Sequence, residues 1–536
     1  MSRTNISIYH LIKYVFALLF AIIISIPVIF KLLGIDYSIS DINENRHLAD
    51  LPKYKETSLK DLPRVWDRYL NDRISLRQVF MPAYIWLWEK TLKSPVSEYV
   101  TGKNGELFMN HAAPVVSASL GLLPWNNQQK AELRVSTAGK FALFYSKGIE
   151  YYIVLIPDKT TLYPDLLPWY TDLIPHEGWY QTQFSQISKA NVPFIALKEY
   201  FEKNSDKTRF YDKIFDNCHW NGNALNIAYQ IISSKIFKNH PDLTPVTMPE
   251  YYELYNQEPD FFPYGRDHTQ FIKLNNSNNF TCTEDFPNEL KTSEFNKLCT
   301  NNSIANGSMW FFSDSYFGGT HGSEAITPFV HNYHTYWHRH YNIDLSKNSY
   351  TLFIDQSIKF NKPDVVIESF VERMRGIVIS YQDELIRTLG DYWLKTDGII
   401  LDQQISKDAF TLDQIEISNS EKSITIKTLG NDSKILFKDI FVADDLGRIY
   451  MAVMIKSDIN AVAQLFYAAP HENFSESKSI TKMIKKGENL FHFNLMVKPH
   501  EKIKLRFDPS NQPGTFIIQE IPELKDLREK IKENGI

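Results

Sequence analysis

The residue types best suited to chemistry stand in two short segments, Asp216-Asn217-Cys218-His219-Trp220 and Ser313-Asp314-Ser315. An apolar run precedes Ser315 and a pair of glycines follows it. A serine at the end of a buried strand, ahead of such a turn, can present its hydroxyl to a cleft. To become a nucleophile it needs a base, and the base needs an acid to orient it. We therefore predict a nucleophilic site with Ser315 as nucleophile, His219 as base and Asp216 as acid.

Alternating strand and helix patterns surround these segments. The continuous apolar run at 151–157 is typical of a strand buried on both faces of a parallel sheet. Residues 192–197 and 363–368 are further predicted strands, and helical patterns separate the three segments. The alternation predicts a three-layer α/β/α domain. Ligands of such folds bind at the carboxyl ends of the strands. Lys159 and Tyr163, which directly follow the first run, are therefore candidate substrate contacts.

Two stretches differ from this pattern. Residues 240–305 are polar and dense in Asn, Pro and Asp, which predicts a long loop or insertion. From about residue 396, short alternating segments such as 423–427 and 503–507 predict an all-β sandwich or jelly roll. The sandwich carries no catalytic constellation, so a glycan-binding module and a structural sandwich both fit it.

The N-terminus predicts one membrane-spanning helix. Tyr14 to Phe30 is an uncharged apolar run of 17 residues, at the lower limit for a span. Arg3 and Lys13 precede it, so the bulk of the chain should lie outside the cytoplasm. No small-x-small cleavage site follows, which favours an anchor over a cleaved signal peptide. The predicted domains are an anchor at 1–35, a linker at 36–60, the α/β domain at 61–395 and the sandwich at 396–536.

The composition excludes several functions. The net charge is -5 and no Lys/Arg-rich block is present, so no nucleic-acid partner is expected. No cysteine pair has CxxC spacing and the histidines at 331–340 are irregularly spaced, so neither a metal nor a cofactor is predicted. Cys282 and Cys299 flank a polar segment. In an oxidising compartment they form either a disulfide or a free pair.

Seven segments occur in the order found in one known family. They are Glu44-Asn45-Arg46, Asn71 to Arg77, Gly102 to Phe108, Pro157 to Pro164, Asp216 to Trp220, Ser313 to Ser315 and Pro363 to Arg373. Together they resemble the SGNH-hydrolase-like proteins of alginate O-acetylation and the related DHHW-motif proteins. The reversed triad order, with the Asp-His segment ahead of the serine, matches the acetyltransferase group. The resemblance therefore implies an SGNH-like domain with permuted triad order.

The resemblance also implies a function and a location. Such a protein is exported, is held in the inner membrane by a single span, and keeps its catalytic part in the periplasm. It transfers acetyl groups to polysaccharide hydroxyls through an acetyl-serine, and a membrane-bound O-acyltransferase supplies the acetyl. A carbohydrate acetylesterase with the same triad and a non-catalytic glycan-binding assembly protein are the alternatives.

The resemblance assigns Ser315 as nucleophile and His219 as base, and it leaves two positions for the acid. Asp216 has the general DxxH spacing, whereas Asn217 stands where the alginate-type proteins carry aspartate. Ser313 replaces the glycine that usually opens the serine motif. The candidates for the oxyanion or for substrate contacts are Gly318, Tyr316, Lys159, Tyr163, Trp220 and Arg373.

Overall fold

The computed structural model divides the chain into two compact units, 1–99 and 100–536. It describes residues 14, 15, 17, 18, 21, 25, 52, 61–72, 99–110, 114–168, 171–172, 177–204, 209–211, 219–239, 280–283, 297–301, 307–314, 316, 332–337, 350–374, 383–402, 409–419 and 423–535.

The first unit contains the helix α2, Leu62–Asp72, in which the rings of Trp66 and Tyr69 meet edge to face at 5.8 Å. The membrane span predicted at 14–30 lies mostly outside the described residues; the six of its residues that are described are helical. Among all described residues, no helix is long and apolar enough to cross a bilayer.

The second unit is built around a seven-stranded sheet with the order β4-β3-β9-β7-β8-β6-β5. Its strands are β3 Glu150–Ile156, β4 Phe194–Ala196, β5 Phe280–Thr283, β6 Lys297–Asn301, β7 Ser308–Ser313, β8 Asn332–Trp337 and β9 Val365–Val371. From β4 to β8 all neighbours are parallel, and β6 and β5 continue the sheet antiparallel. This parallel core matches the predicted α/β domain.

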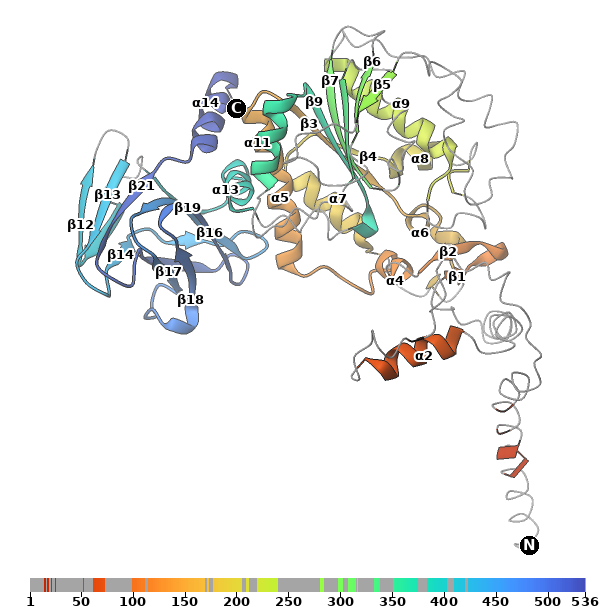
Figure 1. Ribbon diagram of the computed structural model, residues 1–536, viewed down its shortest axis with the longest axis horizontal. Coiled ribbons are helices and arrows are strands. Elements are labelled where there is room, and N and C mark those ends of the chain that lie inside the picture. Colours follow the sequence, from red (N-terminus) through yellow and green to blue (C-terminus); the bar gives the residue numbers. More distant parts are fainter. Residues whose placement is uncertain are drawn as a thin grey trace, which may run out of the picture. The chain divides into compact units, whose positions relative to one another are not determined.

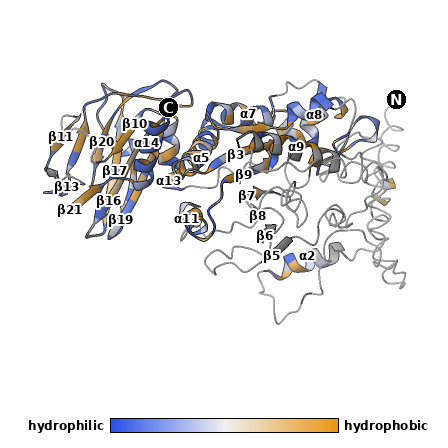
Figure 2. Cartoon of the chain, turned by 90° about the horizontal axis from the view of Figure 1, so that it is seen from above, coloured by the Kyte–Doolittle hydropathy of each residue, from blue (hydrophilic) through white to orange (hydrophobic). Residues whose placement is uncertain are grey.

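Side-chain alternation along the strands makes three layers, as Figure 1 shows. In β3, Tyr151, Ile153 and Leu155 enter one core and the residues between them enter the other. Helices of the first core are α5 Asn127–Ser146, α7 Trp179–Lys189, α11 Tyr350–Phe360 and α13 Glu384–Trp393; those of the second are α8 Lys198–Asn204 and α9 Gly222–Asn239. Hydrophobic residues, orange in Figure 2, accordingly gather on the strands and on the helices beside them. The predicted three-layer arrangement is confirmed.

Short elements complete the α/β part. The strands β1 Tyr99–Thr101 and β2 Leu107–Met109 form a two-stranded sheet around the turn at Asn104-Gly105, both of which have positive φ. The remaining short helices are η3 Lys103–Gly105, α4 Val115–Ser119, α6 Lys159–Leu162, η4 Pro164–Leu166 and η11 Glu372–Met374.

Three strands were not predicted. β5 and β6 lie in the polar stretch assigned to a loop, and β8 lies in the aromatic- and histidine-rich segment that follows β7. β5 and β6 are short and carry few apolar residues, so their own pattern is weak. Their hydrogen bonds to neighbouring strands, which are contacts distant in sequence, define them as strands.

Two further sheets form the predicted C-terminal sandwich around a common apolar core. One sheet contains β10 Gly398–Leu401, β12 Ile415–Asn419, β13 Ser423–Thr428, β16 Arg448–Ser457, β19 Gly487–Met496 and β21 Gly514–Gln519. The other contains β11 Phe410–Asp413, β14 Lys434–Phe437, β15 Phe441–Val442, β17 Ala461–Ala468, β18 Ser479–Ile484 and β20 Lys502–Asp508, with η13 Glu476–Lys478 leading into β18.

After the sandwich the chain returns to the α/β core. The last helix, α14 Pro522–Asn534, buries Leu524 and Leu527 completely in the same apolar cluster as α5 and β3. Asn534 near its end donates to the hydroxyl of Tyr145 in α5 at 2.6 Å. The α/β core is therefore made of residues from both sides of the sandwich in sequence.

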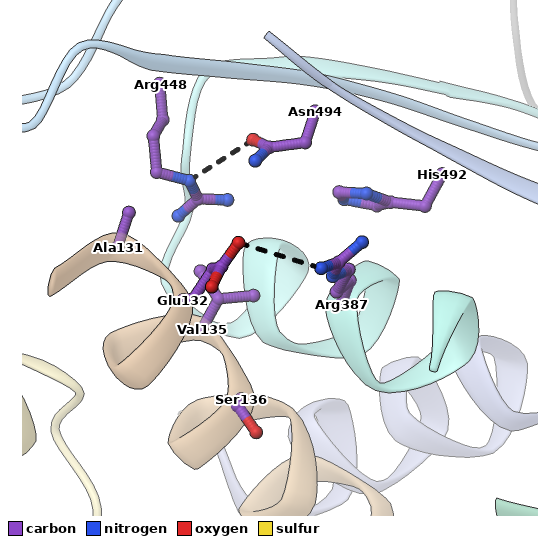
Figure 3. A pocket seen from close by; sticks show the side chains of 8 residues that line it. All are labelled: Ala131, Glu132, Val135, Ser136, Arg387, Arg448, His492 and Asn494. Carbon is purple, nitrogen blue, oxygen red and sulfur yellow. Dashed lines mark hydrogen bonds and ion pairs between the residues drawn. The ribbon is translucent and has the colours of Figure 1, made fainter. Parts of the chain in front are cut away.

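A buried carboxylate joins α13 to the sandwich. Asp391 accepts a hydrogen bond from Arg448 of β16, and its other oxygen lies 2.7 Å from Nε2 of His492 in β19. Burial raises the pKa of Asp391, but the charge of Arg448 and the bond with His492 outweigh it and hold that pKa below its usual value. Figure 3 shows Arg448 and His492 facing α5 and α13 across a small pocket. All three groups are at most 2 % exposed.

The helices under this contact approach each other closely. A Cβ on Gly139 of α5 would lie 1.9 Å from the carbonyl oxygen of Ile386, and one on Gly390 of α13 would lie 2.2 Å from that of Val135. Only glycine fits at either position, so the packing of α13 against α5 is closely defined at these two residues. Asp391 directly follows Gly390, and its position is fixed with the helix.

We predict that Asp391→Ala lowers the free energy of unfolding by about 3–5 kcal/mol, because it leaves the buried guanidinium of Arg448 without its carboxylate. The matched control is Glu416→Ala. Glu416 pairs with Lys427 at 3.4 Å, and both side chains are more than half exposed, at 63 % and 59 %. A loss of less than about 1 kcal/mol is expected there. Urea unfolding measures both, and equal losses would contradict the assignment.

Candidate functional site

The candidate site lies where parallel strands end. β3 is followed by Asp158, β7 by Asp314 and β9 by Arg373. β9 pairs with both β3 and β7, so these three carboxyl ends are neighbours. Polar residues gather here because α/β folds leave this edge open for ligands.

Asp314 ties two of these strand ends together. Its Oδ1 accepts from the N–H of Tyr316 at 3.0 Å, a tight turn that encloses position 315, and its Oδ2 accepts from the N–H of Val371 at 2.6 Å. Burial raises the pKa of Asp314 to about 6, although the two N–H donors and the charge of His219 lower it. This carboxylate therefore fixes the backbone on both sides of the predicted nucleophile.

His219, just ahead of α9, also lies near these strand ends. Its half-buried ring lies 5.3 Å from the ring of Tyr316. The next residue, Trp220, donates from Nε1 to the carbonyl oxygen of Tyr316 at 2.8 Å. Asn221 then caps α9 by accepting from the N–H of Ala224 at 3.3 Å. The predicted base thus lies beside Tyr316, and its role as a base stays a prediction.

A buried ion pair supports Tyr316 from below its ring. Arg373 donates to Asp158 and, at 2.8 Å, to the hydroxyl of Tyr316, with its guanidinium 5.0 Å from that ring. Tyr316 in turn donates to Oδ1 of Asp158 at 3.3 Å. Burial lowers the pKa of Arg373 to about 9. Tyr316, Arg373 and Asp158 therefore hold one another in a single arrangement.

Glu372 adds a buried carboxyl next to this pair. It accepts from the backbone N–H of Asp158 at 2.6 Å, and its own carbonyl accepts from Gln183 of α7 at 2.6 Å. Burial raises the pKa of Glu372 to about 8. Its burial therefore favours the neutral, protonated form of this carboxyl.

Two predicted substrate candidates contact other groups. Lys159 is buried, lies 2.8 Å from Glu106, and donates to the carbonyl oxygen of Leu107 at 2.7 Å. The hydroxyl of Tyr163 accepts from the N–H of Phe210 at 2.9 Å. Lys159 therefore anchors the β1–β2 sheet, and Tyr163 supports the backbone ahead of the His219 segment.

The structure thus brings His219, Trp220, Tyr316 and Arg373 together. Ser315, Asp216, Asn217 and Gly318 lie outside the described residues, so their roles stay predictions. Sequence reasoning missed the roles of Asp158 and Asp314. Both directly neighbour residues that had been selected, Lys159 and Ser315, and both follow an apolar strand, which is the signal that could have identified them.

A metal centre finds no support in the described part of the chain. None of its histidine, cysteine, aspartate and glutamate side chains form a group that could hold an ion.

Residues 100–279 match the family model described as "SGNH hydrolase-like domain, acetyltransferase AlgX". The match confirms the resemblance over this part of the chain, which includes His219 and the whole of β3. No curated protein matches the chain.

Several solved structures resemble the chain distantly. The O-acetyltransferase domain of Pseudomonas putida AlgJ is 14% identical with a TM-score of 0.34, covering 55% of this chain and 99% of that one. Bacillus cereus PatB1, solved with a sulfonyl adduct, is 15% identical with a TM-score of 0.32, covering 53% and 97%. Pseudomonas aeruginosa AlgX is 11% identical with a TM-score of 0.30, covering 78% and 93%. These likenesses are too distant to say anything of the activity.

We predict that hydrolysis of an aryl acetate by this site falls as the pH drops through about 6, where Asp314 becomes protonated and stops accepting both N–H bonds. Asp314→Asn makes the acidic limb of the kcat/KM profile less steep, because only the proton taken up by the catalytic base then remains in that limb. It also lowers the plateau by about 10-fold, because an amide cannot accept from both Tyr316 and Val371. The exposed Asp165→Asn is the control.

Unfolding does not explain such an acidic loss. The folded pKa of Asp314 lies above its unfolded value of about 3.9, so its contribution to stability is full at low pH and declines as the pH rises through about 6. An acidic limb as steep in Asp314→Asn as in the wild type would contradict the role given to this carboxylate.

Proposed function

We propose that the protein is an exported, membrane-anchored O-acetyltransferase that acetylates hydroxyls of a cell-surface or exopolysaccharide through an acetyl-serine on Ser315. The observation that carries this proposal is the position of His219, whose ring lies 5.3 Å from Tyr316, the residue after Ser315. The match of residues 100–279 to an acetyltransferase-type SGNH domain supports the reaction class.

The first half-reaction forms the acetyl-serine. His219 takes the proton from the Ser315 hydroxyl, and the oxygen attacks the carbonyl carbon of an acetyl donor. Asp216, or the group at position 217, stabilises the imidazolium. Backbone N–H groups near Ser315 and Gly318 hold the oxyanion. His219 then gives its proton to the leaving group, and the acetyl group remains on Ser315.

The second half-reaction transfers the acetyl group. His219 removes the proton from a sugar hydroxyl, whose oxygen attacks the acetyl-serine, and the regenerated Ser315 takes the proton back. Water attacking instead would make the same site an esterase, so exclusion of water decides between the two outcomes. Tyr316, Arg373 and Asp158 contact one another and are buried. Their close packing supports the exclusion of water beneath the proposed site.

A glycan partner for the sandwich is part of the proposal, with one restriction. Every aromatic ring of the sandwich that the structure describes is buried or half-buried, including Tyr467 and Phe474 near its surface. Stacking on sugars therefore cannot use a flat exposed ring among those residues. Contact with a glycan would rely on polar side chains instead.

We predict that Ser315→Ala and His219→Ala each reduce acetyl transfer by at least about 10³-fold, because each removes one member of a unit that acts together. Full-length protein is incubated with an aryl acetate and an acceptor oligosaccharide. Mass spectrometry then measures the acetylated sugar. The folding control is Ser146→Ala, whose hydroxyl bonds only to the carbonyl oxygen of Leu143 within α5.

The products separate the candidate functions. Acetylated oligosaccharide supports the transferase, and free acetate without acetylated sugar would indicate an esterase. Absence of turnover that depends on Ser315 would contradict both and leave a non-catalytic glycan-binding protein.

The proposed location has the N-terminal 35 residues in the inner membrane and the remainder in the periplasm, beside a membrane-bound O-acyltransferase that supplies acetyl. The uncharged run at 14–30 and the preceding Arg3 and Lys13 support this orientation. We predict that external protease digests the chain in spheroplasts, whereas inverted vesicles protect it. Removal of residues 1–35 should leave the protein in the cytoplasm, and protease resistance in intact spheroplasts would contradict the orientation.

A further inference from the structure

The two outermost strands of the seven-stranded sheet bring two cysteines to the same register position. β5 and β6 are antiparallel, and Cys282 is the direct partner of Cys299. These residues are 17 positions apart in the sequence, with a polar segment between them. Pairing of the strands, rather than closeness in sequence, makes them neighbours.

The register is compatible with the Cα spacing of a disulfide. Directly opposite residues of an antiparallel pair have Cα atoms about 4.5–5.5 Å apart. Disulfides span Cα separations of about 4.4–6.8 Å. Side chains of such a pair also share one face of the sheet. The Cα spacing of directly opposite strand positions therefore allows a link between Cys282 and Cys299.

We propose that Cys282 and Cys299 form a disulfide that closes the outer edge of this sheet. The oxidising location that it needs rests on the export proposed above. A protein disulfide of that compartment is the oxidant: one thiolate attacks it to give a mixed disulfide, and the second thiolate then displaces the donor as a dithiol. Two protons and two electrons leave the chain, and one S–S bond forms.

The link would act on the strand that leads to the predicted nucleophile. β6 pairs with β8, and β8 pairs with β7, which ends two residues before Ser315. β6 also precedes β7 directly in the chain, with residues 302–307 between them. Joining β5 to β6 covalently keeps the last strand of the sheet paired, and therefore holds the support of β7 in register.

The chain offers an internal control for the test, because Cys218 is its one remaining cysteine. Full-length exported protein is alkylated with iodoacetamide under denaturing conditions before any reduction, and is then digested with trypsin. We expect peptides 274–291 and 298–339 to be joined, with Cys218 alkylated. Reduction should separate the two peptides and expose two further thiols. Cys218→Ser should keep the link.

Alkylation of both Cys282 and Cys299 in the unreduced exported protein would overturn the inference, and so would a link from either to Cys218. Such a result leaves acetyl transfer untouched. Reoxidation of the purified protein in glutathione buffers tests the pair without export. Joined peptides in these buffers would support the link. If the protein is at the same time found in the cytoplasm of the cell, that finding contradicts the proposed location and not the link.

A stability measurement tests the consequence. Dithiothreitol should lower the unfolding midpoint of the wild type. The double variant Cys282→Ser/Cys299→Ser should begin at that lower midpoint and should not respond to the reductant. An equal response of both proteins would overturn the proposed link.

Discussion

The carboxylate of Asp314 is the contact on which the candidate site depends. Its two oxygens accept N–H bonds from Tyr316, two residues on, and from Val371, at the end of the neighbouring strand. Removing a carboxylate from water is costly, and its raised pKa reflects that cost. Two backbone donors offset part of it. These two hydrogen bonds connect the ends of β7 and β9. His219 and Arg373 therefore lie beside a backbone that is held in place.

Buried charge is used in the same way elsewhere in the described part of the chain. Lys140 of α5 lies 2.6 Å from Glu368 of β9, which also accepts from Tyr151. Asp391 joins α13 to the sandwich in the same fashion. Such pairs add little stability compared with a well-packed apolar replacement, but they have defined directions. They specify one geometry where helices, sheet and sandwich meet, which apolar contacts alone would leave less defined.

The sequence predicted the parallel core because β3, β7 and β9 are mostly apolar, and such segments depend little on their neighbours. It also selected His219 and Tyr316, which follow these segments or precede a capped helix. The strands β5 and β6 could not be predicted because residue types in them are polar, and only pairing with distant strands makes them strands. Asp158 was overlooked because its role depends on its contact with Arg373. The two residues are more than two hundred positions apart, and the sequence alone does not reveal that they are in contact.

The return of α14 to the α/β core has a consequence for synthesis of the chain. Ile521, Leu524 and Leu527 belong to the apolar cluster that also contains β3, yet they follow the whole sandwich in the sequence. The apolar core of the α/β domain therefore stays incomplete until the sandwich and α14 have been synthesised, although domains generally fold in order of synthesis. A chain that stops before α14 leaves an apolar gap against α5. Completion of the α/β core is therefore coupled to synthesis of the sandwich that precedes α14.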